Sequence, residues 1–381
     1  MAEINVAMIG YAFMGRAHSN AWRQAPHFFP GPLKPRLKVI CGRRQEAAQQ
    51  AADQLGWEEV ETDWRRVVAR PDIGIVDIVT PGDSHAEIAI AAAQAGKHVI
   101  CEKPLANSLD EALAMLAAVK PAGVRHMVLF NYRRVPAMRL ARQWIEAGRL
   151  GRLFHFRAQY LQDWIVDPQF PRVWRLDKTI AGSGALGDLG AHVVDICHYL
   201  TGRRVEKVSS LMATLIPERP LPDEPRRMAP VTVDDAALFI GRAGEMTAQF
   251  EVSRLAPGRK NCLTLEINGS QGSLRFNLER LNELEFYDRT QPEELQGWNN
   301  ILVTDARHPF IPHWWPAGHI LGYEHPFVHA MAEFLEAVAK GGEIHPDFAD
   351  GAACNAVLDA VERSAASGAW TEVKAWAAAM Q

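Results

Sequence analysis

The fold is decided near the N-terminus, by the stretch Ile4-Asn-Val-Ala-Met-Ile-Gly10-Tyr-Ala-Phe-Met-Gly15-Arg-Ala-His18. A short apolar run at 4–10 predicts a strand, and the turn that follows it leads into a helical pattern at 15–24. Such a turn places backbone N–H groups where a helix N-terminus would meet a pyrophosphate. Ala12 stands at the middle glycine position of the strict G-x-G-x-x-G pattern. The stretch therefore predicts a dinucleotide-binding turn, with a plain strand-to-helix turn as the alternative.

The same alternation of short β-branched runs and longer Ala-rich stretches continues to about residue 130. It predicts strands at 4–10, 37–41, 75–79, 98–101 and 124–130, and helices at 15–24, 45–55, 63–69, 85–95 and 108–118. Strands that alternate with helices are typical of βαβ units and a parallel sheet. We therefore expect an NAD(P)-binding Rossmann domain over residues 1–130.

Beyond residue 130 the pattern changes to strands that follow one another directly, which indicates a mostly antiparallel sheet. Expected strands lie at 153–161, 205–215, 231–241, 244–253, 261–268, 272–278 and 283–288, and expected helices at 136–147, 185–200, 325–339 and 348–366. The stretch 292–324 has no clear period and is expected to be an ordered loop. Residues 131–381 are thus predicted to form an α+β domain with a large, mostly antiparallel sheet.

Composition excludes several classes of partner. The 381 residues carry a net charge of -4 with both signs scattered, so no basic surface is expected for nucleic acid or for a membrane. No secretion leader or membrane span is recognisable, and the five widely spaced cysteines are typical of free thiols in a reducing compartment. The histidines at 308, 313, 319 and 325 lack a metal-ligand spacing, so no metal is expected. We expect a cytoplasmic protein.

The end of the second strand bears on the choice of cofactor. An acidic residue for the adenosine ribose belongs there, but the sequence reads Val39-Ile-Cys-Gly-Arg43-Arg44. A guanidinium can hold a 2′-phosphate or stack on adenine, which favours NADP over NAD. The alternative is that Arg43 and Arg44 are solvated residues at a helix start.

Four motifs together carry a family resemblance. They are the turn Gly10–Gly15, Thr80-Pro81 with His85, Cys101-Glu102-Lys103-Pro104, and Gly187-Asp188-Leu-Gly-Ala-His192-Val-Val-Asp195. Together they resemble the Gfo/Idh/MocA oxidoreductases over essentially the whole chain. The tail segment Trp314-Trp315-Pro-Ala-Gly-His-Ile-Leu-Gly-Tyr323-Glu-His-Pro-Phe327 resembles inositol and levoglucosan dehydrogenase-like members.

The resemblance implies an NAD(P)-dependent oxidoreductase that moves a hydride between a sugar, anhydrosugar or inositol-type polyol and nicotinamide. It makes Lys103 the catalytic lysine and Asp188 and His192 the catalytic pair of the second domain. A spacing of four residues on a helix also puts Asp188 and His192 on one face, independently of the resemblance. The alternative is that Asp188 caps its helix while His192 and Asp195 are ordinary polar residues on it.

Two groups of residues are expected to surround these catalytic side chains. The cofactor group comprises Gly10, Ala12, Phe13, Met14, Gly15, Arg43, Arg44, Thr80, Pro81, His85, Glu102, Lys103 and Asn131. Sugar sites combine hydrogen-bonding groups with aromatic platforms. The substrate group is Lys103, Tyr132, Arg133, Tyr160, Asp163, Trp164, Trp174, Arg175, Asp188, His192 and Tyr323. For each tryptophan, the alternative is that it packs in the core or at an interface.

Two rival functions remain open from the sequence. One is an NAD-dependent glycoside hydrolase of the same fold, and the other is a nucleotide-binding regulator without catalysis. The predicted antiparallel sheet has one face without helices, and that face must be covered. We therefore expect a homodimer or homotetramer formed through the sheet.

Overall fold

The computed structural model describes residues 2–374, which divide into two units. The first unit comprises 2–134 and Gly322–Ala352, and the second comprises Val135–Leu321 and 353–374. We expected one continuous second domain from residue 131 onward. Instead, Gly322–Ala352 belongs with the first unit because helix α9 (His325–Lys340) packs on helix α1 (Phe13–Phe28).

The first unit is built on a six-stranded sheet in the order β3-β2-β1-β4-β5-β6. Every neighbouring pair in this sheet is parallel. The strands are β1 (Ala2–Ile9), β2 (Leu33–Cys41), β3 (Glu59–Glu61), β4 (Ile75–Ile78), β5 (His98–Cys101) and β6 (His126–Val128). This is the order of a doubly wound dinucleotide-binding fold, so the expected Rossmann architecture is confirmed.

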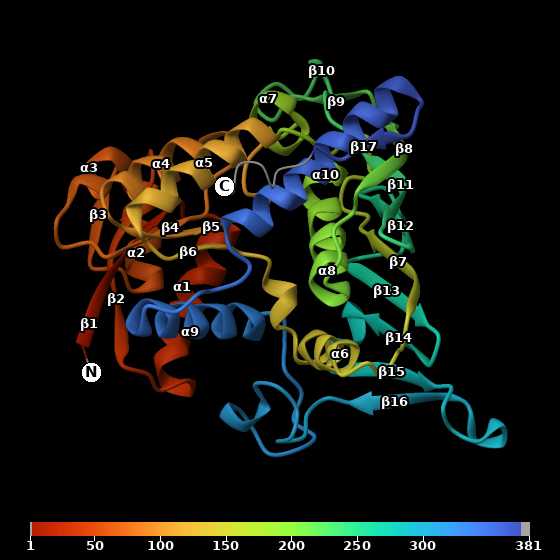
Figure 1. Cartoon of the computed structure of the whole chain (residues 1–381). Helices are drawn as coiled ribbons and strands as arrows, with labels where there is room; N and C mark the ends of the chain where they lie inside the picture. Colours follow the sequence, from red (N-terminus) through yellow and green to blue (C-terminus); the bar gives the residue numbers. More distant parts are fainter. Residues whose placement is uncertain (1, 375–381) are drawn as a thin grey trace. The chain divides into compact units, whose positions relative to one another are not determined.

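Helices cover both faces of this sheet (Figure 1). One face carries α1, α2 (Gln45–Leu55) and α9; the other carries α3 (Trp64–Ala69), α4 (His85–Gln94) and α5 (Leu109–Ala122). The expected helix starts are present, because Asp63 accepts from the N–H of Arg65 and Ser108 forms a capping box with Glu111. Buried on both faces, β4 contains no exposed residue.

The second unit contains a nine-stranded sheet in the order β16-β15-β14-β13-β7-β12-β11-β8-β17. Only the pair β7 and β12 is parallel, so the expectation of a mostly antiparallel sheet is confirmed. The strands are β7 (Leu153–Leu161), β8 (Lys207–Ala213), β11 (Ala236–Ala243), β12 (Met246–Ser253), β13 (Cys262–Gly269), β14 (Gly272–Asn277), β15 (Glu283–Asp288), β16 (Trp298–Leu302) and β17 (Thr371–Glu372). A separate hairpin joins β9 (Glu218–Pro220) to β10 (Met228–Pro230).

One face of the large sheet is packed against helices and the other is open (Figure 1). The helices on the packed face are α6 (Pro136–Glu146), α8 (Ala191–Thr201) and α10 (Phe348–Ser367). In β11, buried and exposed residues alternate from Ala237 to Ala243, as a strand with one solvated face requires. The alternation brings Leu238 and Ile240 to the open face, where they are 46% and 47% exposed.

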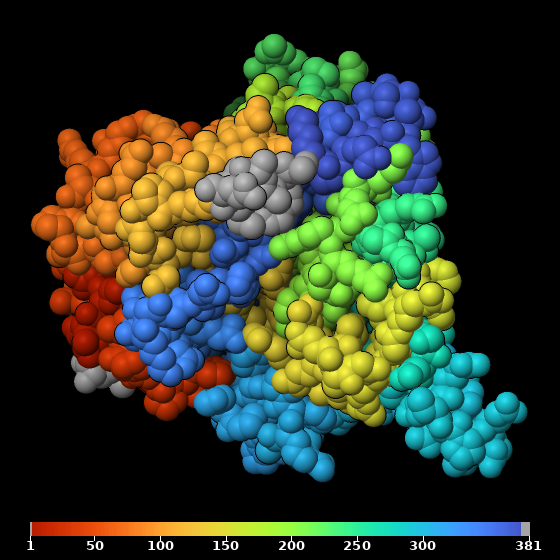
Figure 2. All heavy atoms as spheres, viewed as in Figure 1, coloured from red at the N-terminus to blue at the C-terminus, as the bar shows by residue number. Residues whose placement is uncertain are grey.

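The connection between β15 and β16 projects from the second unit, as the cyan residues near 290 show in Figure 2. Strand β16 itself lies within the stretch 292–324 that was expected to be a loop, so that expectation was partly wrong. All five cysteines are free and buried. Among residues 2–374 we find no helix that combines the length and the apolar character needed to cross a membrane.

Candidate functional site

The glycine turn after β1 has a shape that only glycine allows. Gly10 has a φ of +112°, and a Cβ at this position would lie 2.8 Å from the backbone oxygen of Val79. Its N–H donates to the carbonyl of Cys41 at 2.9 Å, which fixes the turn across the ends of two neighbouring strands. At the other glycine of the motif, a Cβ on Gly15 would lie 3.1 Å from the carbonyl oxygen of Gly10.

Helix α1 begins at Phe13 with the properties of an anion site. Ala12 is its N-cap and offers no side-chain acceptor, and no acidic residue occupies the first turn. The first N–H groups of a sixteen-residue helix are therefore not capped by a side chain, which suits a phosphate. The turn between Gly10 and Gly15, here called the glycine cradle, and this helix start together fit the pyrophosphate of a dinucleotide.

The end of β2 carries the two expected arginines. Arg43 and Arg44 are exposed, and Arg44 is the N-cap of α2. A Cβ on Gly42 would overlap the ring of Tyr11, so glycine lets that ring lie against the strand end. Burial raises the pKa of Asp83, which follows β4, and the charge of Arg43 opposes this rise. A carboxylate therefore lies within electrostatic reach of Arg43, although sequence reasoning found none at the end of β2.

His85 links two strand ends of the first unit. Its ring is buried, with Nε2 2.9 Å from the carbonyl oxygen of Thr80 and Nδ1 3.2 Å from that of Pro104. The residue thus connects the Thr80-Pro81 segment to the turn that contains Lys103. Lys103 follows β5, and its N–H donates to Oε2 of Glu102 at 3.0 Å.

The segment after β6 contributes three buried side chains, Asn131, Tyr132 and Arg133. Asn131 is 3% exposed, and its amide Nδ2 has no hydrogen-bond partner among the described residues. A buried donor of this kind is costly unless a ligand or water completes it, so Asn131 fits a polar group of the cofactor. Arg133 has its Nη1 3.4 Å from Asp350.

Tyr323 lies beside the glycine turn in the first unit. Its ring stacks on Phe13 with centroids 6.3 Å apart and meets Phe327 edge-on at 5.3 Å. The rings of Phe13 and Tyr323 are 60% and 38% exposed. The structure therefore groups Tyr323, expected at the substrate, with a residue expected at the cofactor.

In the second unit, Asp188 lies in a π-helical turn, η4 (Leu186–Gly190), that leads into α8. Its Oδ2 accepts from Nη2 of Arg254 at 2.8 Å. Arg254 is 2% exposed, whereas the Asp188 side chain is 28% exposed. The guanidinium thus anchors the carboxylate from the buried side, and π-turns of this kind are frequent at functional sites.

The π-turn is held in place by a second carboxylate, Asp234. Its two oxygens accept from the N–H groups of Gly184 and Leu186, both at 2.7 Å. A Cβ on Gly184 would lie 1.8 Å from the backbone oxygen of Asp234, so the approach requires glycine. Sequence reasoning missed Arg254 and Asp234, because nothing local signals a partner 48 to 66 residues away.

His192 is on the first turn of α8 and is 6% exposed. Its ring meets Tyr160 edge-on, with centroids 5.8 Å apart. The hydroxyl of Tyr160 donates to Oδ1 of Asn261 at 2.7 Å, and Gln162 donates to the same oxygen at 2.8 Å. Tyr160 is itself buried, so the structure places it as a support for the His192 ring.

The remaining expected substrate residues divide into two groups. Trp164 lies near Arg254, whose Cζ is 5.4 Å from its ring, and Arg175 lies over the ring of Trp174 at 4.3 Å. Asp163 instead accepts from Nζ of Lys260 at 2.8 Å and from the N–H of Gly258. The Lys260 hydrogen bond lowers the pKa of Asp163 below its ordinary value. Asp163 therefore has partners in a neighbouring loop.

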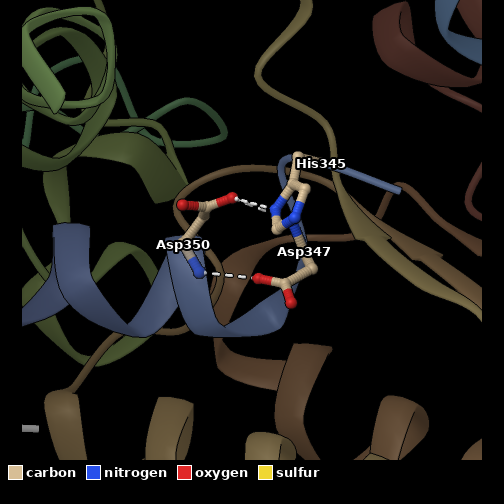
Figure 3. Close-up of side chains that lie close together, drawn as sticks. All are labelled: His345, Asp347 and Asp350. Carbon is tan, nitrogen blue, oxygen red and sulfur yellow. Dashed lines mark hydrogen bonds and ion pairs between the residues drawn. The ribbon is translucent and has the colours of Figure 1, made fainter. Parts of the chain in front are cut away.

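One further cluster in the first unit has the composition of a metal site: His345, Asp347 and Asp350 (Figure 3). The hydrogen bonds among these three residues are those of a helix start, because the segment leads directly into α10. Asp347 Oδ1 accepts from the N–H of Asp350 at 2.9 Å, and Asp350 Oδ2 lies 2.9 Å from Nδ1 of His345. The bond to Asp350 raises the pKa of His345. We assign these residues to the helix start.

Comparison with known proteins agrees with this geometry. A family model described as an oxidoreductase family with an NAD-binding Rossmann fold matches residues 4–130, and the GFO/IDH/MocA C-terminal domain matches 138–275. The levoglucosan dehydrogenase of Pseudarthrobacter phenanthrenivorans is 43% identical over 98% of this chain and 99% of its own.

Two solved structures are similar over nearly the full length. An oxidoreductase domain protein from Kribbella flavida is 53% identical with a TM-score of 0.96, covering 98% of this chain and 100% of its own. A levoglucosan dehydrogenase in complex with NADH and levoglucosan is 44% identical with a TM-score of 0.94, covering 97% and 99%. With both family models matched in sequence order, the chain belongs to the Gfo/Idh/MocA family of oxidoreductases.

Proposed function

We propose that this protein is an NAD(P)-dependent dehydrogenase that oxidises a C–OH group of a levoglucosan-type anhydrosugar, a sugar or an inositol-type polyol. The observation that carries the proposal is the full-length similarity to levoglucosan dehydrogenase, including a structure with NADH and levoglucosan. The glycine cradle at Gly10 and the buried donor of Asn131 support cofactor binding by this chain's own residues. Reduction of the corresponding ketone is the same reaction in reverse.

We assign each candidate site residue a separate role in the reaction. A bound nicotinamide dinucleotide supplies the hydride acceptor. His192 removes the proton of the substrate hydroxyl as general base, and Lys103 stabilises the charge that develops on that oxygen. Asp188, anchored by Arg254, accepts hydrogen bonds from neighbouring substrate hydroxyls. Trp164, Trp174 and Arg175 offer apolar faces and donors suited to a sugar ring.

Absorbance at 340 nm tests the proposal, with purified protein, NAD or NADP, and a panel of levoglucosan, inositols, aldoses and glycosides. We expect reduced cofactor to accumulate with one class of polyol. Glycoside cleavage without net NADH would instead indicate the hydrolase. Tight cofactor binding with no turnover of any compound would indicate a regulator.

We further propose that Arg43 and Arg44 let the enzyme accept NADP. Replacing both by alanine is expected to lower kcat/KM for NADP by about 10- to 100-fold, because a charge-assisted phosphate contact contributes about 1.5–3 kcal/mol. The value for NAD should change less than about threefold. Initial rates with each cofactor measure this, and Arg66→Ala on α3 is the control. An equal loss with both cofactors would contradict the proposed contact with the 2′-phosphate.

The open face of the large sheet is the surface through which we propose that the chain forms a homodimer or homotetramer. Leu238 pairs in register with Leu211, and Ile240 lies two residues along the same strand. All three are between 46% and 65% exposed, so they form an apolar patch on neighbouring strands. Charged and polar residues around the patch, such as Arg157 and Gln249, provide a rim.

Replacing Leu238 by arginine is expected to shift the oligomer toward a smaller species, because a buried unpaired charge opposes association. Light scattering coupled to size-exclusion chromatography measures the mass, at several protein concentrations. The charge-matched control is Gln50→Arg on the exposed face of α2, which should leave the mass unchanged. An unchanged mass for Leu238→Arg would exclude this face as the interface.

A further inference from the structure

Three titratable side chains meet in the interior of the first unit. His18 on α1 and Asp77 in β4 are both 0% exposed, and Glu102, directly after β5, is 5% exposed. Nδ1 of His18 is 3.0 Å from both carboxylate oxygens of Asp77, and its Nε2 is 3.1 Å from Oε1 of Glu102. Nε1 of Trp22 donates to Asp77 at 2.8 Å.

The imidazole of His18 is therefore a cation that donates from both nitrogens. Burial alone lowers the pKa of His18, but the charges and hydrogen bonds of Asp77 and Glu102 outweigh it and raise the pKa to about 10. Each nitrogen faces a carboxylate, and a doubly protonated ring is the form that donates to both.

The cluster reaches the catalytic turn through the second oxygen of Glu102. While Oε1 faces His18, Oε2 accepts from the N–H of Lys103 at 3.0 Å. A continuous series of hydrogen bonds thus runs from Asp77 through His18 and Glu102 to the backbone of Lys103. His18 is on the same helix whose N-terminus forms the dinucleotide turn, so the series joins that helix to the turn of Lys103.

Such a cluster is a poor means of stabilising a fold. Desolvating three charges costs several kcal/mol for each ion, and apolar residues of similar volume often stabilise a core as well or better. What charged hydrogen bonds supply is direction, because donors and acceptors must align. Misplacing a reacting group by about 1 Å can cost about 100-fold in rate. A site whose chemistry depends on one lysine requires that the lysine be held in a fixed position and orientation.

We propose that His18 is a positioning residue for Lys103: it fixes the Glu102 carboxylate, which in turn fixes the Lys103 backbone relative to the dinucleotide-binding helix. The proposal rests on the proposed function only for the role of Lys103 in turnover. The local link itself is a property of the protein without cofactor and can be tested separately.

The first test measures amide hydrogen exchange at Lys103 in the cofactor-free protein. His18→Gln keeps a similar length but can donate to only one of the two carboxylates. Glu102→Gln has one acceptor oxygen in place of two, so it can no longer accept from both the His18 ring and the Lys103 N–H. We expect exchange of the Lys103 N–H to rise at least about 10-fold in either variant, because the acceptor is no longer held. Unchanged exchange in both would overturn the proposal.

The second test is a kinetic cycle. His18→Gln is expected to lower kcat by about 10- to 100-fold, the usual loss when a supporting hydrogen-bond partner is removed, with the sugar KM within about threefold. In a Lys103→Ala background the same substitution should cause no further loss of kcat, because His18 acts through Lys103. A multiplicative further loss would show that His18 has a general structural role.

Val67→Ala on α3 is the matched control, because it removes buried apolar volume from the same unit away from the cluster. It should lower Tm without changing the Lys103 exchange rate or kcat. If His18→Gln and Val67→Ala lose Tm equally and behave alike in both assays, the proposal is wrong. If the wild-type protein oxidises no polyol, the proposed function fails, while the exchange test still decides the link.

Discussion

Lys103→Ala is expected to lower kcat for polyol oxidation by about 1000-fold. The reason is electrostatic: removing one donor that stabilises developing oxyanion charge costs about 100- to 1000-fold in known enzymes, and Lys103 is the donor proposed for that role here. The fold should persist, because the bond that ties this turn to Glu102 uses the backbone N–H of Lys103 and remains in the variant. Initial rates at 340 nm measure the loss, and NADH fluorescence should show a Kd within about threefold of wild type.

Lys97 provides a matched control for this substitution. Lys97 is a buried lysine of the same unit, directly before β5, whereas Lys103 follows that strand; the Nζ of Lys97 donates to the carbonyl of Arg70. Lys97→Ala should lower Tm while leaving kcat unchanged. If Lys103→Ala retains more than about a tenth of wild-type kcat, the lysine is not the group that stabilises the substrate oxygen.

The parallel sheet of the first unit was predictable because its signals are local. Each strand is a short apolar run bounded by turn residues, and starts such as Asp63 and the Ser108–Glu111 capping box lie within four residues of the groups that they satisfy. Strand β3 was missed because Glu59–Glu61 is three residues long and half-buried. Its place in the sheet comes from pairing with β2, which no local pattern records.

The segment that contains Asp188 and His192, the proposed catalytic pair, could not be predicted correctly from local sequence. A regular helix was expected over 185–200, and on such a helix Asp188 and His192 would share a face. The structure has a π-helical turn over Leu186–Gly190 and an α-helix only from Ala191, so the assumed spacing of 3.6 residues per turn does not hold across the pair. The turn depends on the carboxylate of Asp234, which accepts from the N–H of Leu186, 48 residues away in the sequence.

The other interactions that the sequence did not reveal join residues that are distant in the chain. His18 and Asp77 are 59 residues apart, and Asp188 and Arg254 are 66 apart. A lone histidine on a helix or an arginine at a strand end gives no sign of such a partner in a single sequence. The candidate catalytic residues could thus be proposed from motifs, whereas the residues that contact and orient them could be found only in the fold.

His192→Ala is expected to lower kcat/KM by about 100- to 10,000-fold, the range typical of losing a general base. An imidazole accepts a proton only when it is neutral, so activity that depends on it falls at low pH. The acidic limb of the kcat/KM profile should therefore disappear in the variant. Profiles between pH 5 and 10 with a saturating cofactor measure both effects.

His198 supplies the control on the same helix. It is buried, its Nε2 accepts from the N–H of Val205, and no role in turnover is assigned to it. His198→Gln keeps an acceptor at that position and should lower Tm while preserving both limbs of the profile.

The alanine variants of Lys103 and His192, the two residues proposed to be catalytic, also distinguish two mechanisms. If the acidic limb survives in His192→Ala but is lost in Lys103→Ala, the lysine is the general base and His192 only binds the substrate. A lysine can act in this way when its surroundings favour the neutral amine. If the limb is lost only in His192→Ala, then Lys103 works as a cation throughout, and Lys103→Arg should recover part of the rate that alanine loses. An inactive Lys103→Arg beside a normal NADH Kd would mean that the position of the ammonium, and not its charge alone, sets the rate.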